Sequence, residues 1–92
     1  MLKEYKGALF VRLREQSIGT CNLIGKRVEQ RRKELNMKQK TLLLQLQPFG
    51  IDLTSSGLSK LEGQIRKVSD YELIALAKAL GVSVHWLLGL DD

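Results

Sequence analysis

Residues 39–62 read QKTLLLQLQPFGIDLTSSGLSKLE, and this stretch predicts two short helices joined by a turn. The first helix is expected at about 39–46 and is followed by a proline and a glycine, which both end helices. The second helix begins with Thr54 or Ser55 as its cap and buries two leucines three residues apart. Its outward positions carry small hydroxyl residues and one lysine, namely Ser55, Ser56, Ser59 and Lys60. A face this slim is suited to lie against another molecule.

Downstream, two further helices are marked by their ends. Ser69 and Glu72 form a capping box, in which each side chain bonds the free backbone N–H of the other, so a helix is expected from there to Leu80. Gly81 can end this helix in a left-handed conformation, and Ser83 caps a last short helix. Apolar residues at helical spacing are expected to face the core: Leu73, Ile74, Leu76, Ala77, Leu80, Val84, Leu87 and Leu88.

Upstream, Asn22 can cap a helix over residues 23–35, with Asn36 as its stop. Its expected core positions are Ile24, Val28, Arg31 or Arg32, and Leu35. Residues 1–22 form an N-terminal arm whose structure the sequence leaves open, because its apolar residues fit a strand and a helix, and an unstructured arm fits as well. The sequence predicts an all-α fold of five helices in one domain, residues 23–92.

The net charge of +5 is concentrated in one part of the chain. Residues 23–40 hold seven basic and two acidic side chains, the basic ones being Lys26, Arg27, Arg31, Arg32, Lys33, Lys38 and Lys40. A basic patch of this kind predicts a polyanion as partner. Taken alone, the charge run is better explained as a solvated helix face.

Several classes of function lack the residues that they need. Cys21 is the only cysteine, so neither a disulfide nor a metal site is predicted, and the reducing cytoplasm is the expected location. His85 has no acid or thiol at catalytic spacing, which predicts a surface histidine and no enzymatic activity. No apolar run of about 18 residues could span a bilayer. We therefore expect no cofactor, no membrane partner and no small-molecule substrate.

The end of the chain carries the most specific family signal. Residues 76–89, LAKALGVSVHWLLG, combine a glycine stop, a serine cap and an aromatic residue at set intervals. Together with Gln39 and the SKLE of residues 59–62, they make the segment 23–89 resemble the helix-turn-helix domain of phage repressor and Cro proteins, the XRE-like group. The resemblance implies a lambda-repressor-like fold, binding of double-stranded DNA as a homodimer, and regulation of transcription as a repressor.

The resemblance also implies roles for individual residues, with the helix 54–62 in the major groove. It implies base contacts for Ser55, Ser56, Ser59 and Lys60. It implies phosphate contacts for Gln39, Lys38, Thr54, Arg66 and Lys67. The family pattern further pairs Arg32 with Glu62, so we expect a partly buried ion pair that holds the third helix on its scaffold. Trp86 is expected in the core or at a dimer interface.

Departures from the family pattern concern how the third helix is held. Lys38 stands where a serine or threonine usually caps, Leu43 where a small residue is common, and Gln64 where a glycine often follows. The turn over residues 47–53 is longer than in the compact motif, so the tilt of the third helix is left open. A second hypothesis is an antitoxin-like interaction module, whose N-terminal arm covers a partner protein and whose DNA binding is autoregulatory.

Overall fold

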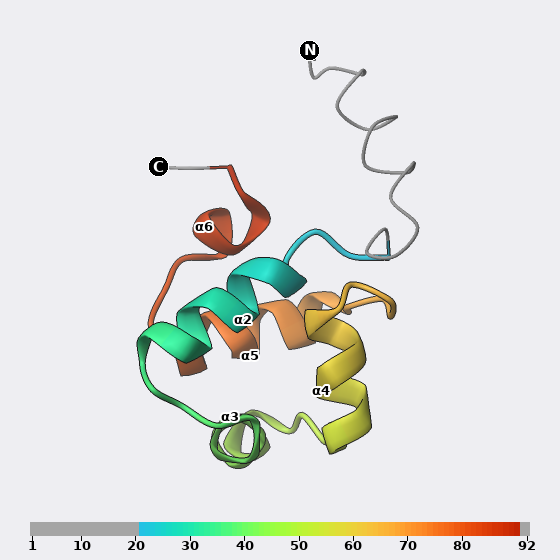
Figure 1. Ribbon diagram of the computed structural model, residues 1–92, viewed down its shortest axis with the longest axis vertical. Coiled ribbons are helices and arrows are strands. Elements are labelled where there is room, and N and C mark those ends of the chain that lie inside the picture. The colour runs from blue at the N-terminus through green and yellow to red at the C-terminus, as the bar shows by residue number, and fades with distance from the viewer. Residues whose placement is uncertain (1–20, 91–92) are drawn as a thin grey trace.

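Five α-helices and one 3-10 turn make up residues 21–90, the part of the chain that the computed structural model describes (Figure 1). They are α2 (Gly25–Glu34), α3 (Gln39–Leu46), η1 (Gln47–Phe49), α4 (Ser55–Glu62), α5 (Asp70–Leu80) and α6 (Val84–Leu88). No strand occurs in these residues, which confirms the all-α class for the described part. The expectations for the N-terminal arm fall almost entirely on residues 1–20, which lie outside it.

Four of the five helices in the described residues begin where short polar side chains bond their free backbone donors. The side-chain oxygen of Asn22 accepts from the backbone N–H groups of Ile24 and Gly25 at 3.1 and 2.8 Å, just before α2. The capping box that opens α5 is present, and the Ser83 hydroxyl oxygen accepts from the Trp86 backbone N–H at 2.9 Å in α6. These local signals explain why most helix ends follow from the sequence.

The long turn between α3 and α4 continues the helical path of α3. The 3-10 turn η1 directly follows α3, and Gly50 ends it with a left-handed φ of 79°. The backbone N–H of Ile51 donates to the Leu46 carbonyl oxygen at 3.3 Å, and the side chains of Ile51 and Leu53 are half-buried. The extra residues are therefore folded onto the domain by a glycine turn and two apolar anchors.

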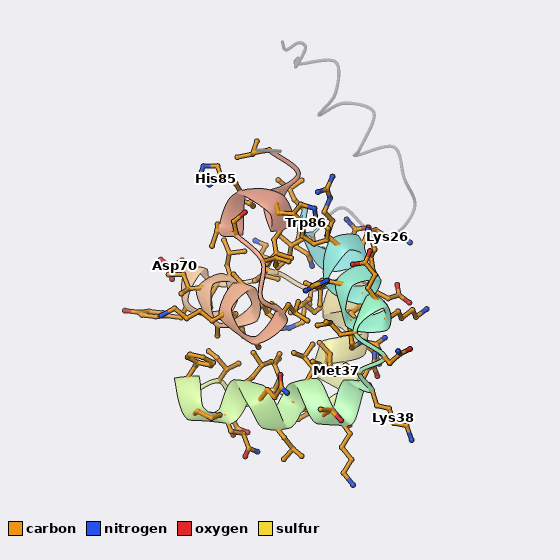
Figure 2. The ribbon with its side chains drawn as sticks, turned by 90° about the vertical axis from the view of Figure 1, so that its left-hand side faces the viewer. Lys26, Met37, Lys38, Asp70, His85 and Trp86 are labelled. Atoms are coloured by element: carbon orange, nitrogen blue, oxygen red, sulfur yellow. The ribbon has the colours of Figure 1, made fainter. Side chains whose placement is uncertain are left out.

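The core forms where the five helices meet, and leucine dominates it. α4 packs on α2 and α3, while α5 packs on α2, α3 and α6. In both ribbon views, α3 and α6 lie at opposite ends of the domain with α5 between them (Figures 1 and 2). The large side chains with almost no exposure are Leu42, Leu46, Leu58, Leu61, Leu76, Leu80, Leu87 and Val28. Burial of these residues fixes α4 with its leucines inward and its serines outward.

Two residues expected in the core are on the surface. Leu35 is 40% exposed, because it follows the last residue of α2 and the chain turns away at Asn36, whose φ is 56°. Ile74 is 48% exposed, whereas Ala75 beside it is buried. Since α5 is covered by three other helices, its buried surface is not the single stripe that periodicity predicts. Of the two arginines considered for the core side of α2, Arg32 is the buried one.

None of the helices in residues 21–90 combines the length and the apolar character that crossing a membrane requires.

Candidate nucleic-acid interface

A buried ion pair joins three helices at one point. The Arg32 guanidinium of α2 donates to the Glu62 carboxylate of α4, from Nε to Oε2 at 2.7 Å and from Nη2 to Oε1 at 3.0 Å. Its Nη1 atom donates to the Met37 carbonyl oxygen at 2.9 Å, just before α3. The hydrogen bond to Glu62 is the main reason that the pKa of Arg32 lies above its usual value. The ion pair expected from the sequence is present, and it ties the start of α3 and the end of α4 to α2.

Gln39 extends this contact from Glu62 to the surface of α4. Its amide nitrogen Nε2 donates to Glu62 Oε1 at 3.0 Å, and its amide oxygen Oε1 accepts from Ser59 Oγ at 3.3 Å. The side chain expected to bind a phosphate is therefore held on both sides, with one amide hydrogen left over. Lys38, the N-cap of α3, makes no capping hydrogen bond, so the first backbone N–H groups of α3 lack a capping side chain and suit an anion.

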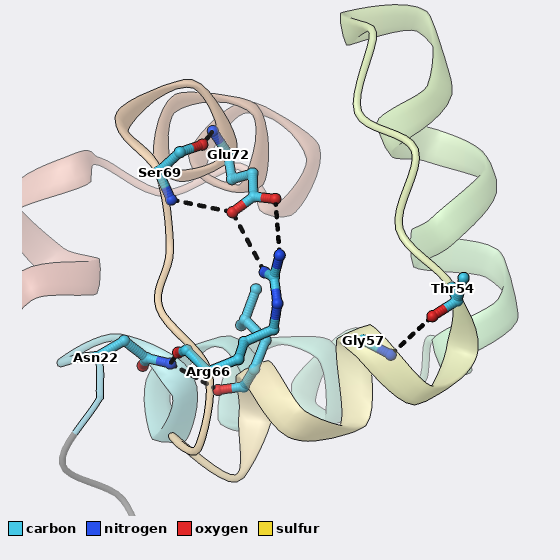
Figure 3. Close-up of polar contacts among 7 residues, drawn as sticks. Asn22, Thr54, Gly57, Arg66, Ser69 and Glu72 are labelled. Carbon is cyan, nitrogen blue, oxygen red and sulfur yellow. Dashed lines mark hydrogen bonds and ion pairs between the residues drawn. The ribbon is translucent and has the colours of Figure 1, made fainter.

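The outward face of α4 carries the four residues expected to contact bases. Leu58 and Leu61 are fully buried on its inner side. At its start, the Thr54 hydroxyl oxygen accepts from the Gly57 backbone N–H at 2.9 Å (Figure 3). Thr54 thus acts as the helix cap, and its hydroxyl hydrogen is what remains for the expected phosphate contact. The side chains on the exposed face are Ser55, Ser56, Ser59 and Lys60.

Asn22 fastens the end of α4 to the start of α2. Its amide nitrogen donates to the carbonyl oxygens of Leu61 and Arg66 at 3.1 and 2.8 Å (Figure 3). Gln64 has a left-handed φ of 64°, and its side-chain Nε2 donates to the Asn22 carbonyl oxygen at 3.1 Å. Gly25 lies so close that a Cβ atom there would overlap the Leu61 carbonyl oxygen. The sequence predicts Asn22 only as a cap, because its partners in α4 and beyond are 39 and 44 positions away.

Arg66, expected at a phosphate, is engaged inside the domain. Its two terminal nitrogens each donate to a carboxylate oxygen of Glu72 at 3.2 Å (Figure 3). Burial acts to raise the pKa of Glu72, but the Ser69 backbone N–H and the Arg66 guanidinium outweigh it, so that pKa lies below its usual value. These two bonds hold the connector against the start of α5, and the expected phosphate contact of Arg66 stays a prediction. The neighbouring Lys67 is exposed.

Arg27 and Arg31 of α2 bond carbonyl oxygens of α6 and α5. Arg27 lies 4.8 Å from the centre of the Trp86 ring and donates to the Trp86 carbonyl oxygen at 3.0 Å. Arg31 donates to the Leu80 carbonyl oxygen, at the end of α5, at 2.9 Å. Lys33 pairs with a glutamate one turn earlier at 2.9 Å. Carbonyl groups at helix ends lack intrahelical donors, and these guanidinium groups supply them.

Trp86 and His85, neighbours in α6, differ in exposure. Trp86 is half-buried and points toward α2, so it packs against that helix (Figure 2). His85 is exposed and points away from the bundle (Figure 2).

Four lysines before and within α3, on α4 and in the following connector have no acidic partner within the described residues. Lys38 and Lys40 lie at the start of α3, Lys60 lies on α4, and Lys67 follows in the connector. None of these four has an ion-pair or hydrogen-bond partner for its ammonium group within residues 21–90. Gln39, which lies between Lys38 and Lys40 in the chain, is bonded to Ser59 on the exposed face of α4. The arrangement joins a slim hydroxyl face to cations and uncapped N–H groups.

A pocket of about 380 Å³ lies where the chain before α2 meets the connector, α5 and α6. Leu23, Leu73 and Leu88 form part of its wall, and Lys67 and Asp70 also line it. No residue of α4 lines this pocket.

Comparison of the chain with protein families, curated proteins and solved structures finds no match, so the site is interpreted from its own geometry.

Proposed function

We propose that the protein binds double-stranded DNA sequence-specifically, as a transcriptional regulator of the repressor type acting in the cytoplasm. In this proposal the fold is lambda-repressor-like, α3 and α4 are the helix-turn-helix pair, and α4 enters the major groove. The single observation that carries it is the exposed face of α4, where three serines and one lysine stand on a helix anchored by a buried ion pair.

The dimensions of α4 support this proposal. A helix with its side chains is about 10–12 Å across, and the major groove of B-DNA is about 12 Å wide. Serine hydroxyls keep the leading face of α4 slim, and they can donate to or accept from base edges. Lys60 is long enough to reach a guanine, whose groove edge offers two acceptors. Ser55, Ser56, Ser59 and Lys60 are the proposed base contacts.

The hydrogen bonds that fix the position of α4 also support the proposed DNA binding. Sequence readout needs base-contacting groups held within a fraction of an ångström. Arg32 fixes Glu62 at the end of α4, and Asn22 bonds the carbonyl oxygens at the same end. A helix that served only to cover the core would gain nothing from its hydroxyl face.

The phosphate contacts are proposed at the borders of α4. Lys38, Lys40 and the uncapped N–H groups of α3 lie on one side, with Gln39 able to add its remaining amide hydrogen. The Thr54 hydroxyl and Lys67 are the other candidates. Arg66 is a candidate as well, because its two bonds to Glu72 use two of its five N–H donors.

A homodimer is part of the proposal. One domain of this size makes few base contacts, so specific binding calls for two copies that read half-sites about 10 bp, or a multiple of that, apart. Leu23 and Leu90 are 51% and 62% exposed and offer apolar surface near the end of the domain that carries α6. Sedimentation that shows only monomer both free and on DNA would contradict this part.

Selection of bound duplexes from a random pool tests the proposed function. The expected result is a defined site with two-fold symmetry, bound less tightly as salt rises because phosphate contacts release counterions. Lys60→Ala should change the selected site, whereas Lys78→Ala, on α5, is the matched control and should leave it unchanged. A pool that shows no enrichment would refute the proposal.

The apolar pocket favours the second candidate, an antitoxin-like module that binds a partner protein and regulates its own synthesis. No residue of α4 lines the pocket, but Lys67, a proposed phosphate contact, does, so a bound partner would compete with DNA for that residue. Co-purification of one unrelated protein, lost in Leu73→Glu but not in Lys60→Ala, would support this candidate.

A further inference from the structure

A chain of hydrogen bonds runs from the buried ion pair to the base-facing surface, and each bond in it has a defined direction. Arg32 carries donors only, and the Glu62 carboxylate carries acceptors only. Glu62 Oε1 accepts from Arg32 Nη2 at 3.0 Å and from Gln39 Nε2 at 3.0 Å. Since a carboxylate oxygen requires a donor, the amide nitrogen of Gln39 must be the group that faces Glu62.

The orientation of the Gln39 amide sets that of the next group. With Nε2 turned toward Glu62, the amide oxygen Oε1 faces Ser59, and an amide oxygen can only accept. The 3.3 Å contact therefore uses the single hydroxyl hydrogen of Ser59. The Ser59 side chain is exposed on α4, and it keeps two lone pairs free for a molecule in front of it.

We infer that Ser59 reads DNA as a hydrogen-bond acceptor, and that the relay from Glu62 through Gln39 sets this polarity. The inference rests on the proposed function and specifies the base that one residue selects. In the major groove, cytosine presents an amino donor and adenine an amino donor beside an acceptor, whereas guanine and thymine present acceptors only. The base edge that faces Ser59 is therefore cytosine or adenine. Gln39 and Glu62 act as positioning residues, and Ser59 touches the base.

The relay can be broken at its middle residue. In Gln39→Ala, the amide oxygen that accepts from Ser59 Oγ is removed, so the serine hydrogen becomes free to donate to a base. The same serine should then accept guanine or thymine as readily as cytosine or adenine. A residue that merely stabilised the fold would weaken binding to all sequences and would not relax the preference at a single position.

Selection from a random duplex pool with wild type, Ser59→Ala and Gln39→Ala tests the relay. We expect Ser59→Ala to erase the preference at one position of each half-site, where wild type favours cytosine or adenine by roughly 2- to 10-fold. Gln39→Ala should admit guanine and thymine at the same position, because the Ser59 hydrogen is then free. The hydrogen bonds between Arg32 and Glu62 do not involve Gln39, so this variant should fold, which circular dichroism checks.

The outcomes separate this inference from the function on which it rests. A wild-type preference for guanine or thymine at the position sensitive to Ser59 overturns the relay. So does an unchanged preference in folded Gln39→Ala. Failure of wild type to select any sequence refutes the proposed function itself, whereas a defined wild-type site that no Ser59 substitution alters refutes the relay alone.

Discussion

Removing the Glu62 carboxylate should cost far more stability than removing an equally close carboxylate from the surface. In Glu62→Ala, the Arg32 guanidinium keeps its bond to the Met37 carbonyl oxygen but loses two others in a site where its side chain is 11% exposed. Breaking a buried pair by removing one partner costs about 3–5 kcal/mol. The remaining bond to Met37 places our expectation near the lower end, at about 3 kcal/mol. For a domain of this size, that lowers the Tm by about 12–24 °C.

Glu29→Ala supplies the matched control on the same helix as Arg32. Glu29 pairs with Lys33 at 2.9 Å, close to the 2.7 Å of the buried pair, but the two side chains are 34% and 65% exposed. An exposed pair between successive turns of a helix contributes roughly 0.3–0.5 kcal/mol, so Glu29→Ala should lower the Tm by only a few degrees. Urea denaturation followed by circular dichroism measures both variants. Equal losses in the two variants would refute the reasoning that burial makes Arg32–Glu62 decisive.

The other predictions concern packing, DNA and pH. Gly25→Ala should destabilise the domain by about 1–3 kcal/mol, because the new methyl group meets the Leu61 carbonyl oxygen, and thermal denaturation measures the loss. Lys60→Ala should relax the preference at one base position and weaken binding by roughly 1–3 kcal/mol. Lys67→Ala should weaken binding to all duplexes alike, and it should reduce the slope of log binding constant against log salt concentration by about 0.9. Binding titrations at several salt concentrations measure both effects. The pKa of Glu72 is lowered in the folded domain, so its ionised carboxylate stabilises the fold above the pKa of the unfolded chain. This stabilisation disappears as pH falls through the pKa of the folded domain. Stability should therefore decline below about pH 4.5 less steeply in Glu72→Gln than in wild type, as acid titration of unfolding would show.

Controls keep these predictions distinct. Lys78→Ala should leave both the base preference and the salt slope unchanged, since this residue lies on α5. If Lys67→Ala changed the preferred sequence, the assignment of Lys67 to phosphate would be wrong. A Gly25→Ala variant as stable as wild type would mean that α2 and α4 can move apart without cost.

The helices follow from the sequence because their signals are local. A capping residue and the N–H that it accepts lie three positions apart, as for Thr54 with Gly57 and Ser69 with Glu72. Glycines at helix ends act through their own φ, as Gly81 does at 69°. The bounds of α3 and the last residue of α5 could therefore be placed without knowledge of the fold.

The candidate site was only partly predictable. The serines and Lys60 of α4 are exposed as expected, because a short amphipathic helix has one inward face. The ion pair between Arg32 and Glu62 could be expected through a family resemblance. Periodicity alone could not decide whether Arg31 or Arg32 faces the core, since three and four residues after Val28 both lie near the same helix face.

By itself, the sequence determined where the helices begin and end and which face of α4 is small and polar, because these depend on neighbours within one helical turn. Only the tertiary structure decided which charges are free. Arg27, Arg31 and Arg66 look like basic surface residues in the sequence, yet partners 59, 49 and 6 positions away engage them. The direction of the hydrogen bond at Ser59 depends on Gln39 and Glu62 meeting it in space, and no pattern along the chain encodes that meeting.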